Sequence, residues 1–275
     1  MKVLLVLLAV LFSEAGFGQY YFNDIVATQQ SNQNYQILRA NKVKKIVATS
    51  FEQDNTPTEG FLLVQTLSID GKKLITQSGT VSGKKNQITS FFELGKLKKT
   101  QSSSNGIDNK LEFTYNEKGL VKQLSLTSGD TLAKYKSTET REWKYLANGQ
   151  LLSVLKIKNN ADTTVALLVL DEKGNVLEEH WKKKQKETDT YYYYYNTANQ
   201  LTDIVQYNTR AKKLVPVYVY EYDSTGRILQ MTQLSTSGKY LVWKYNYNDK
   251  GLKLMETCFD QDNKILGKIA YQYEF

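Results

Sequence analysis

One short phrase recurs along most of the chain: alternating aromatic residues, then Asn or Asp, two further residues and Gly. Clear copies are Tyr220–Gly226 and Tyr245–Gly251. The last residue of each copy marks a turn, and the turn positions are Gly71, Gly95, Gly119, Gly149, Gly174, Asn199, Gly226 and Gly251. Successive positions differ by 24, 24, 30, 25, 25, 27 and 25 residues. A period this regular predicts a repeat architecture with one supersecondary unit per period.

Each period has the chemistry of a β-hairpin. Asx side chains accept hydrogen bonds from nearby backbone N–H groups, and Gly or Asn adopts the left-handed conformation that closes the turn. A period of about 25 residues holds two strands of about eight to ten residues and two turns. The chain has 20 Tyr and only 2 Pro. This usage favours paired strands, because aromatic residues suit a pleated surface and Pro removes a ladder donor.

Alternation within the strands predicts a sheet with one apolar face. In Val242–Tyr247, Trp and Tyr fall on one face, whereas Val, Lys and Asn fall on the other. The sequence therefore predicts an all-β fold over residues 43–275. We expect a long antiparallel meander of about 16–18 short strands that forms a curled sheet or a β-spiral. The stretches Gln101–Asn109 and Thr127–Thr140 lengthen the period and are expected to be loops.

The copy Tyr222-Asp223-Ser224-Thr225-Gly226-Arg227-Ile228 resembles the YD repeat of exported bacterial RHS-type proteins. The similarity runs from Ile69 to the end of the chain, roughly three-quarters of its length. It implies a long antiparallel meander that coils into a spiral or shell, and in some relatives a role in surface attachment, glycan contact or enclosure of a toxin. This chain is too short to wrap a cargo, and no segment resembles the self-cleaving core or the C-terminal toxin of the large members. The resemblance therefore implies an architecture and not a function.

Residues 1–18 have the features of a secretory signal peptide. Lys2 precedes the apolar run Val3–Phe12, and Gly16 and Gly18 occupy the small-residue positions of a cleavage site. Ten apolar residues span about 15 Å as a helix, half of a hydrocarbon core, so a retained anchor is the weaker alternative.

Residues 19–42 lie outside the repeat and are expected to form an N-terminal arm. The segment is rich in Gln and Asn. Ser31 can cap a short helix that runs to Ala40, with Tyr35 and Leu38 on one face. The alternative is an arm without regular structure.

These features predict an exported protein of the periplasm, the cell surface or the extracellular space. No stretch after residue 18 is apolar enough for a transmembrane helix. The net charge of +8 favours an anionic partner, such as an acidic glycan or an envelope component. The alternative is that Lys occupies the solvated face and the edges of the sheet, because the lysines are spread along the chain. Another protein is a further candidate partner, and no nucleic acid is expected.

The sequence offers few groups for catalysis or metal binding. His180 is the single histidine and Cys258 the single cysteine, so no internal disulfide or multi-thiolate zinc site can form. Alternation places His180 on the face opposite Trp181. We expect a solvated side chain there, among Glu178, Glu179 and Lys182. Cys258 is expected to be a packed sheet residue. We therefore predict no enzymatic activity, no cofactor and no metal.

The aromatic residues are the one constellation that could bind a ligand. Trp143, Trp181 and Trp243, with tyrosines from each repeat, form either a stacking surface for sugars or for a partner's strand, or the buried core of the sheet. The core interpretation is favoured, because a sheet is stable only when its apolar face is covered.

The predicted function is that of a non-catalytic, exported binding or structural module at the cell envelope, with a glycan or a protein as its ligand. The alternative is an outer-membrane β-barrel. Ile269–Phe275 alternates and ends on an aromatic residue, which resembles the terminal strand of such barrels. In Val176–Lys183, however, both faces carry Lys and Glu, and Lys alone costs about 2–4 kcal/mol at the bilayer midplane.

Overall fold

The computed structural model describes residues 20–81, 83, 85–104, 106–130, 132, 134–208, 212–234 and 239–275. The expected signal peptide, residues 1–18, lies outside this part of the chain. The described residues form two compact units. Unit 1 comprises the residues up to Leu97 together with Leu241–Phe275, and unit 2 comprises Lys98–Tyr240.

The chain begins with a helical segment and continues as β-structure. The helical segment consists of the π-helix η1 (Tyr21–Val26) and the α-helix α1 (Ala27–Ala40). The strands are β1 (Lys45–Phe51), β2 (Phe61–Leu67), β3 (Lys73–Thr80), β4 (Lys85–Glu93), β5 (Lys96–Ser104), β6 (Ile107–Tyr115), β7 (Val121–Asp130), β8 (Lys136–Tyr145), β9 (Leu151–Lys158), β10 (Asp162–Leu170), β11 (Val176–Lys183), β12 (Lys186–Tyr195), β13 (Leu201–Asn208), β14 (Lys213–Tyr222), β15 (Ile228–Leu234), β16 (Tyr240–Tyr247), β17 (Lys253–Phe259) and β18 (Ile265–Glu274).

The strands follow one another as an antiparallel meander, as the sequence predicts. In unit 2, each strand from β5 to β14 pairs with the next one along the chain. In unit 1, β1 to β4 form one run of sequential pairs, and β16 to β18 form another. The expected all-β antiparallel fold is confirmed.

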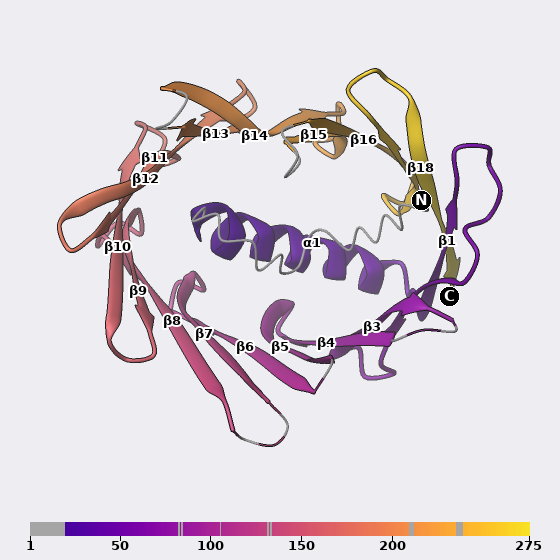
Figure 1. The fold of residues 1–275 in the computed structure, drawn as a ribbon, viewed down its shortest axis with the longest axis horizontal. Helices are drawn as coiled ribbons and strands as arrows, with labels where there is room; N and C mark the ends of the chain where they lie inside the picture. Colours follow the sequence, from indigo (N-terminus) through magenta and orange to yellow (C-terminus); the bar gives the residue numbers. More distant parts are fainter. Residues whose placement is uncertain are drawn as a thin grey trace. The chain divides into compact units, whose positions relative to one another are not determined.

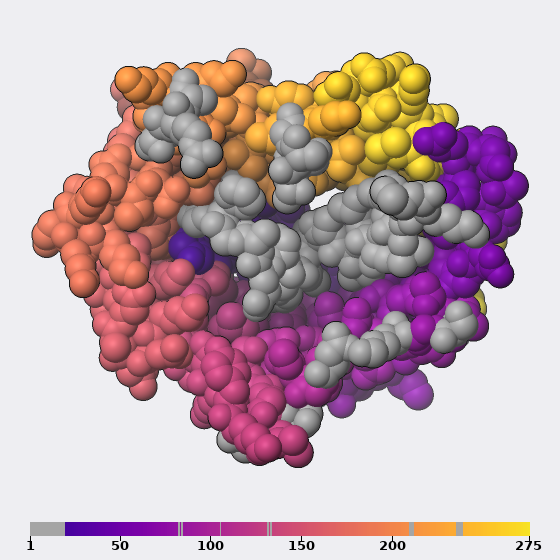
Figure 2. Space-filling model, in the orientation of Figure 1, coloured from indigo at the N-terminus to yellow at the C-terminus, as the bar shows by residue number. Residues whose placement is uncertain are grey.

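The first and the last strands also pair with each other. Val47 of β1 lies opposite Val64 of β2 on one side and opposite Gln272 of β18 on the other, and the two ends of the β-structure lie side by side in Figures 1 and 2. A curled open sheet or a spiral would leave the first and last strands as free edges, with unpaired backbone groups. The expectation of an open sheet or a spiral is therefore wrong.

Most of the described residues in the two stretches expected to be loops belong to strands instead. Gln101–Asn109 belongs to the hairpin of β5 and β6, in which Gln101 pairs with Lys110. Thr127–Thr140 belongs to the hairpin of β7 and β8, in which Thr127 pairs with Thr138. Ser and Thr remove the apolar alternation from these segments, but they do not prevent backbone pairing, and Thr favours strands.

The turns have the predicted Asx chemistry. Asp223 Oδ1 accepts hydrogen bonds from the backbone N–H groups of Thr225 and Arg227, both at 2.9 Å. Gly226 then closes the turn at φ +87°, and Asn199 takes the same role in its repeat at φ +64°. Burial opposes ionisation of Asp223, but the hydrogen bonds from Arg227 and Thr225 outweigh it and hold the pKa of this carboxyl well below its usual range. The charged acceptor therefore persists at neutral pH.

In several hairpins, a tyrosine near the end of the second strand is tied to the start of the first strand. Its hydroxyl donates to the carbonyl oxygen of the first residue of an earlier strand. Burial raises the pKa of Tyr222 and of Tyr273 to about 12, so the hydroxyl stays protonated as a donor. The four bonds are Tyr145 to Val121 at 2.7 Å, Tyr195 to Val176 at 3.0 Å, Tyr222 to Leu201 at 2.5 Å and Tyr273 to Lys253 at 2.6 Å.

Helix α1 is anchored to the turns of unit 1. Tyr35 and Leu38 are buried, as their common helix face predicts. The Tyr35 ring stacks on Phe92 of β4 with ring centroids 3.7 Å apart, and its hydroxyl donates to the carbonyl oxygen of Gly71. Asn32 Oδ1 accepts from the Leu97 N–H at 2.8 Å. The amides of this segment therefore bind backbone groups that the strands leave open.

The helix is longer than predicted. It begins at Ala27, directly after η1, whereas the sequence predicts a start at Ser31. No side chain caps its first turn, since the chain is already helical there. Ser31 therefore lies in the helix interior. Ser favours helix caps, but the helical turns that precede Ser31 override this preference.

Candidate functional site

One face of the sheet in unit 2 carries a row of two large and two small buried residues. Trp143 of β8 lies opposite Val154 of β9, which lies opposite Ala166 of β10, which lies opposite Trp181 of β11. Trp143 is 3% exposed and Trp181 is 2% exposed, and the two small residues between them are fully buried. We call this side of unit 2 the aromatic face and the other side the opposite face.

The three tryptophans proposed as a binding surface are all buried. Trp243 lies in unit 1, where it is 4% exposed and faces Cys258 of β17. Burial leaves no ring surface for a sugar to stack on, so the tryptophans act as core residues in this structure. Alternation of large rings with Val, Ala and Cys across neighbouring strands fills the space above the sheet without overlap.

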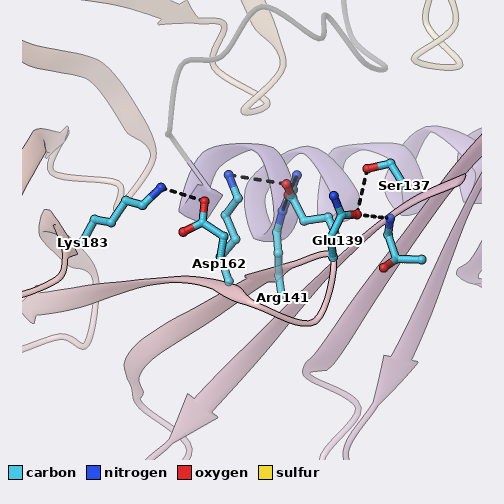
Figure 3. Close-up of polar contacts among 8 residues, drawn as sticks. Ser137, Glu139, Arg141, Asp162 and Lys183 are labelled. Carbon is cyan, nitrogen blue, oxygen red and sulfur yellow. Dashed lines mark hydrogen bonds and ion pairs between the residues drawn. The ribbon is translucent and has the colours of Figure 1, made fainter. Parts of the chain in front are cut away.

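The aromatic face becomes charged where the strands continue beyond the tryptophan row. Six residues form this charged patch. Glu139 bridges two cations, because its Oε1 lies 2.7 Å from the Arg141 guanidinium and its Oε2 lies 3.4 Å from Lys156 Nζ. Lys183 Nζ contacts Asp162 Oδ2 at 2.7 Å (Figure 3). The members are Glu139 and Arg141 of β8, Lys156 and Lys158 of β9, Asp162 of β10 and Lys183 of β11.

Strand pairing explains why these residues share a face. Glu139 and Arg141 stand four and two positions before Trp143, so the period of two puts all three on one side. Lys158 lies opposite Glu139 in one neighbouring strand and opposite Asp162 in the other. Every member is therefore delivered by a regular strand, which holds the charges in fixed positions relative to one another.

Hydrogen bonds to Asn159 link two elements at the end of the patch. Asn159 Oδ1 accepts from Ser137 Oγ at 3.2 Å and from the backbone N–H of Thr138 at 3.0 Å (Figure 3). Asn159 sits in the turn between β9 and β10 at φ +50°, a conformation that Asn tolerates better than most residues. The side chain thus binds β8 to the turn that carries Lys158 and Asp162.

The patch is positively charged overall. Four cations and two carboxylates leave a net charge of +2. The hydrogen bond from Lys183 lowers the pKa of Asp162 against the effect of burial, with help from the charges of Lys183 and Lys156. The side chains of Arg141 and Lys156 are 19% and 23% exposed. Half-buried cations that share one carboxylate can bind an anionic group, because partial burial strengthens the electrostatic attraction between opposite charges.

The aromatic face also holds a buried carboxylate. Glu179 of β11 is fully buried, and it accepts hydrogen bonds from Trp181 Nε1 at 2.8 Å and from the Tyr193 hydroxyl at 2.5 Å. Glu179 is the fourth residue of its strand. The same place holds buried aliphatic residues in other repeats of unit 2, namely Leu124, Val154 and Ile204.

Unit 1 repeats this substitution with Glu256 at the same place of β17. Its carboxylate accepts from the Tyr271 hydroxyl at 2.8 Å and lies 2.9 Å from Lys253 Nζ. Burial, followed by the charge of Glu256, raises the pKa of Tyr271 far above its usual range. Tyr271 and Tyr193 occupy the same position of their repeats, two residues before Tyr273 and Tyr195 respectively. The carboxylate–tyrosine pair is therefore a recurring element of the fold.

The single histidine contacts carboxylates, and the single cysteine is buried. His180 lies on the opposite face, half-buried, with Nε2 2.6 Å from Glu178 Oε2 and Nδ1 3.5 Å from Glu187 Oε1. Glu178 lies beside His180 as the sequence predicts, whereas Glu179 lies on the other face. The ring is only partly solvated, because carboxylates stand on both of its nitrogens. Cys258 is buried, and burial raises the pKa of its thiol to about 12, which disfavours the reactive thiolate.

The described residues hold neither a cluster of metal ligands nor a membrane-spanning helix. No group of three or more His, Cys, Asp or Glu side chains in that part of the chain could hold a metal ion. Among the helices of the described residues, none is both long and apolar enough to cross a membrane.

The charged patch and the buried carboxylate are both indicated by residue positions within the strands and repeats, although overall composition indicates neither. Glu139 and Arg141 fall on the face of Trp143 by strict alternation. Glu179 occupies a repeat position at which other copies have aliphatic residues. Aligning the repeats position by position identifies both, because the departures from the consensus stand out. The two ion pairs across strands could not be found in this way, because they depend on the register.

Comparisons with known proteins define no family for the chain. No family model and no curated protein matches it. One similar solved structure is titled TcdB2-TccC3-TEV, at 16% identity and a TM-score of 0.35, over 74% of this chain and 12% of that one. This chain therefore spans about an eighth of that protein's length.

Two further similar structures are porin-like proteins. The one from Bacteroides uniformis has 10% identity and a TM-score of 0.41, over 84% of this chain and 96% of that chain. The one from Bacteroides vulgatus has 10% identity and a TM-score of 0.26, over 84% and 98% of the two chains. The TM-score of each of these three structures is below 0.5.

Proposed function

We propose that this chain is an exported, non-catalytic module of the cell envelope that binds an acidic glycan at the charged patch of unit 2. The observation that carries the proposal is the patch itself, in which three of four neighbouring cations form ion pairs with two carboxylates on one face of the sheet. Export is supported by the signal-like N-terminus, and an anionic ligand agrees with the net charge of +8.

The geometry favours recognition of charge over stacking of sugar rings. Arg141 and Lys156 both form ion pairs with Glu139. Their side chains are therefore already ordered, and binding of a ligand carboxylate or sulfate does not have to pay the entropy of ordering them. The tryptophans on the same face are buried beside the patch and hold the strands in place. Binding by fixed cations requires no nucleophile, general base or metal, in keeping with the non-catalytic assignment.

Removing one cation of the patch is expected to weaken glycan binding about tenfold. The loss of a charge-assisted hydrogen bond, worth about 1.5–3 kcal/mol, gives an effect of this size or larger. We suggest Lys156→Gln, measured by calorimetric titration with an oligogalacturonate and with a neutral oligosaccharide of equal length. Lys144→Gln is the matched control, since it removes the same charge from the opposite face of β8. Equal losses in both variants would mean that net charge, and not the patch, attracts the ligand.

The second candidate function, an outer-membrane β-barrel, is supported by the pairing of β1 with β18. We propose on this basis that the meander closes into a β-barrel, because closure is what removes the free edges of a meander. Insertion into lipid further requires an apolar band on the outer face. In β8, one face carries Glu142 near mid-strand and Lys144 near its end, and the other carries Glu139 and Arg141 near mid-strand. We therefore rank an aqueous envelope module above a lipid-inserted barrel.

Cell fractionation separates the two candidates. We expect the protein in the soluble periplasmic or extracellular fraction without detergent, since each additional Lys or Arg at the midplane opposes insertion by about 2–4 kcal/mol. Recovery only from detergent-extracted outer membrane, with heat-modifiable migration on a gel, would favour the outer-membrane barrel and reject the aqueous module.

A further inference from the structure

The opposite face of unit 2 bears one apolar patch between charged strands. It lies at the middle of β9 and β10, where most side chains of the opposite face are apolar, whereas the flanking strands carry Glu142 and Lys182 at the same level. Val165, Leu167 and Val169 of β10 are 36%, 43% and 44% exposed, although β10 is paired on both sides. Leu155 of β9, opposite Val165, is half-buried beside them. Adjacent exposed apolar residues on a central strand indicate an interaction surface.

Charges flank this patch in a definite order. Across β8, β9, β10 and β11, one register row reads Glu142, Leu155, Val165 and Lys182. The row therefore begins with an acid and ends with a base, with two apolar residues between. The next row reads Lys144, Ser153, Leu167 and His180, and the last of these is held by Glu178 and Glu187.

Such a row is complementary to itself. A two-fold axis parallel to the strands, between β9 and β10, places each row against the same row of a second copy in reversed order. Leu155 then faces Val165 of the second copy, and Glu142 faces Lys182. In the next row, Lys144 approaches the His180 ring and the two carboxylates that hold it. An isologous two-fold contact requires this property, that one surface match its own rotated image.

We propose that the opposite face of β8–β11 binds a second copy of this chain in a two-fold dimer. The occupant is a second copy because the order of charges fits the rotated surface itself, whereas an unrelated partner would not require an acid and a base at equal distances from the apolar centre. The dimer leaves the charged patch on the aromatic face outside the contact. It does not depend on the proposed function, and it would give a ligand two equivalent binding sites.

The first test measures the oligomeric state of the full-length protein by sedimentation velocity between about 1 and 100 μM, the range of weak complexes with small interfaces. We expect a concentration-dependent monomer–dimer equilibrium. Leu167→Asp should abolish the dimer. Leu214→Asp should leave it unchanged, because Leu214 of β14 is 48% exposed and lies outside the apolar patch. Circular dichroism melting serves as the control that both variants are folded.

The second test exchanges the flanking charges. Glu142→Lys alone places two bases opposite each other, and Lys182→Glu alone places two acids opposite each other, so each should weaken the dimer at least about tenfold. The double variant restores opposite charges and should restore the dimer. Within one chain the two residues are three strands apart, about 14 Å, so recovery cannot arise inside a monomer. A wild-type monomer at all concentrations, equal effects of the two Asp variants, or no recovery in the double variant would overturn the proposal.

Discussion

Replacing Glu179 with alanine is expected to lower the free energy of unfolding by about 2–6 kcal/mol. The carboxylate is fully buried and accepts from Trp181 Nε1 and from the Tyr193 hydroxyl. Alanine leaves both donors buried without this acceptor, and each unsatisfied group costs about 1–3 kcal/mol. Urea denaturation followed by circular dichroism measures the loss.

Two further substitutions separate the hydrogen bonds from the removal of a side chain. Glu178→Ala alters the preceding residue, whose side chain is 36% exposed on the other face, and should change stability by less than about 0.5 kcal/mol. Glu179→Gln keeps one acceptor oxygen, so its effect should be smaller than that of Glu179→Ala. If Glu178→Ala and Glu179→Ala were equally destabilising, the buried carboxylate would have no special role in holding β11 to β12.

The repeat made the local structure of this chain predictable. Asx residues, positive-φ Gly and the tyrosine before each turn act within a hairpin, and each repeat tests the same pattern again. Asp223 and Gly226 behave as the sequence predicts because the turn depends only on residues next to them. The same reasoning failed at Ser- and Thr-rich stretches such as Thr127–Thr140, where strand pairing continues without an apolar pattern to reveal it.

The pairing of β1 with β18 could not be predicted from the repeat. Lys45 and Glu274 lie opposite each other at the two ends of the β-structure, and they form a 2.7 Å ion pair. No local pattern determines whether a meander leaves its end strands free, because that depends on the accumulated twist and curvature of all the strands. An open sheet and a closed one therefore have the same hairpin sequence signals.

The candidate site was hidden for a different reason. The sequence points to the tryptophans, because they are large and rare, and the structure buries all three. Arg141 reaches Glu139 from two residues further along β8, but only register brings Lys156 of β9 to the same carboxylate. Charge clusters assembled across strands depend on the pairing of distant residues, which no single-strand pattern contains.

Replacing Trp143 with alanine is expected to destabilise the protein by about 3–5 kcal/mol, the usual cost of removing a buried aromatic side chain. Trp143 is 3% exposed and packs in the row that contains Val154 and Ala166, neither of which can expand to fill the space. Circular dichroism during urea denaturation gives the value without relying on tryptophan fluorescence. Tyr194→Ala is the control, because this aromatic side chain is 46% exposed on the opposite face.

The same variants decide between core and binding surface. If Trp143 is a core residue, Trp143→Phe should recover much of the stability and should bind the acidic glycan as the wild type does. If the indole stacked on a sugar, Trp143→Phe would instead lose affinity for the acidic and the neutral oligosaccharide alike, with little loss of stability. The charged patch predicts the first pattern, because its cations contact the ligand and the tryptophan row only positions the strands that carry them.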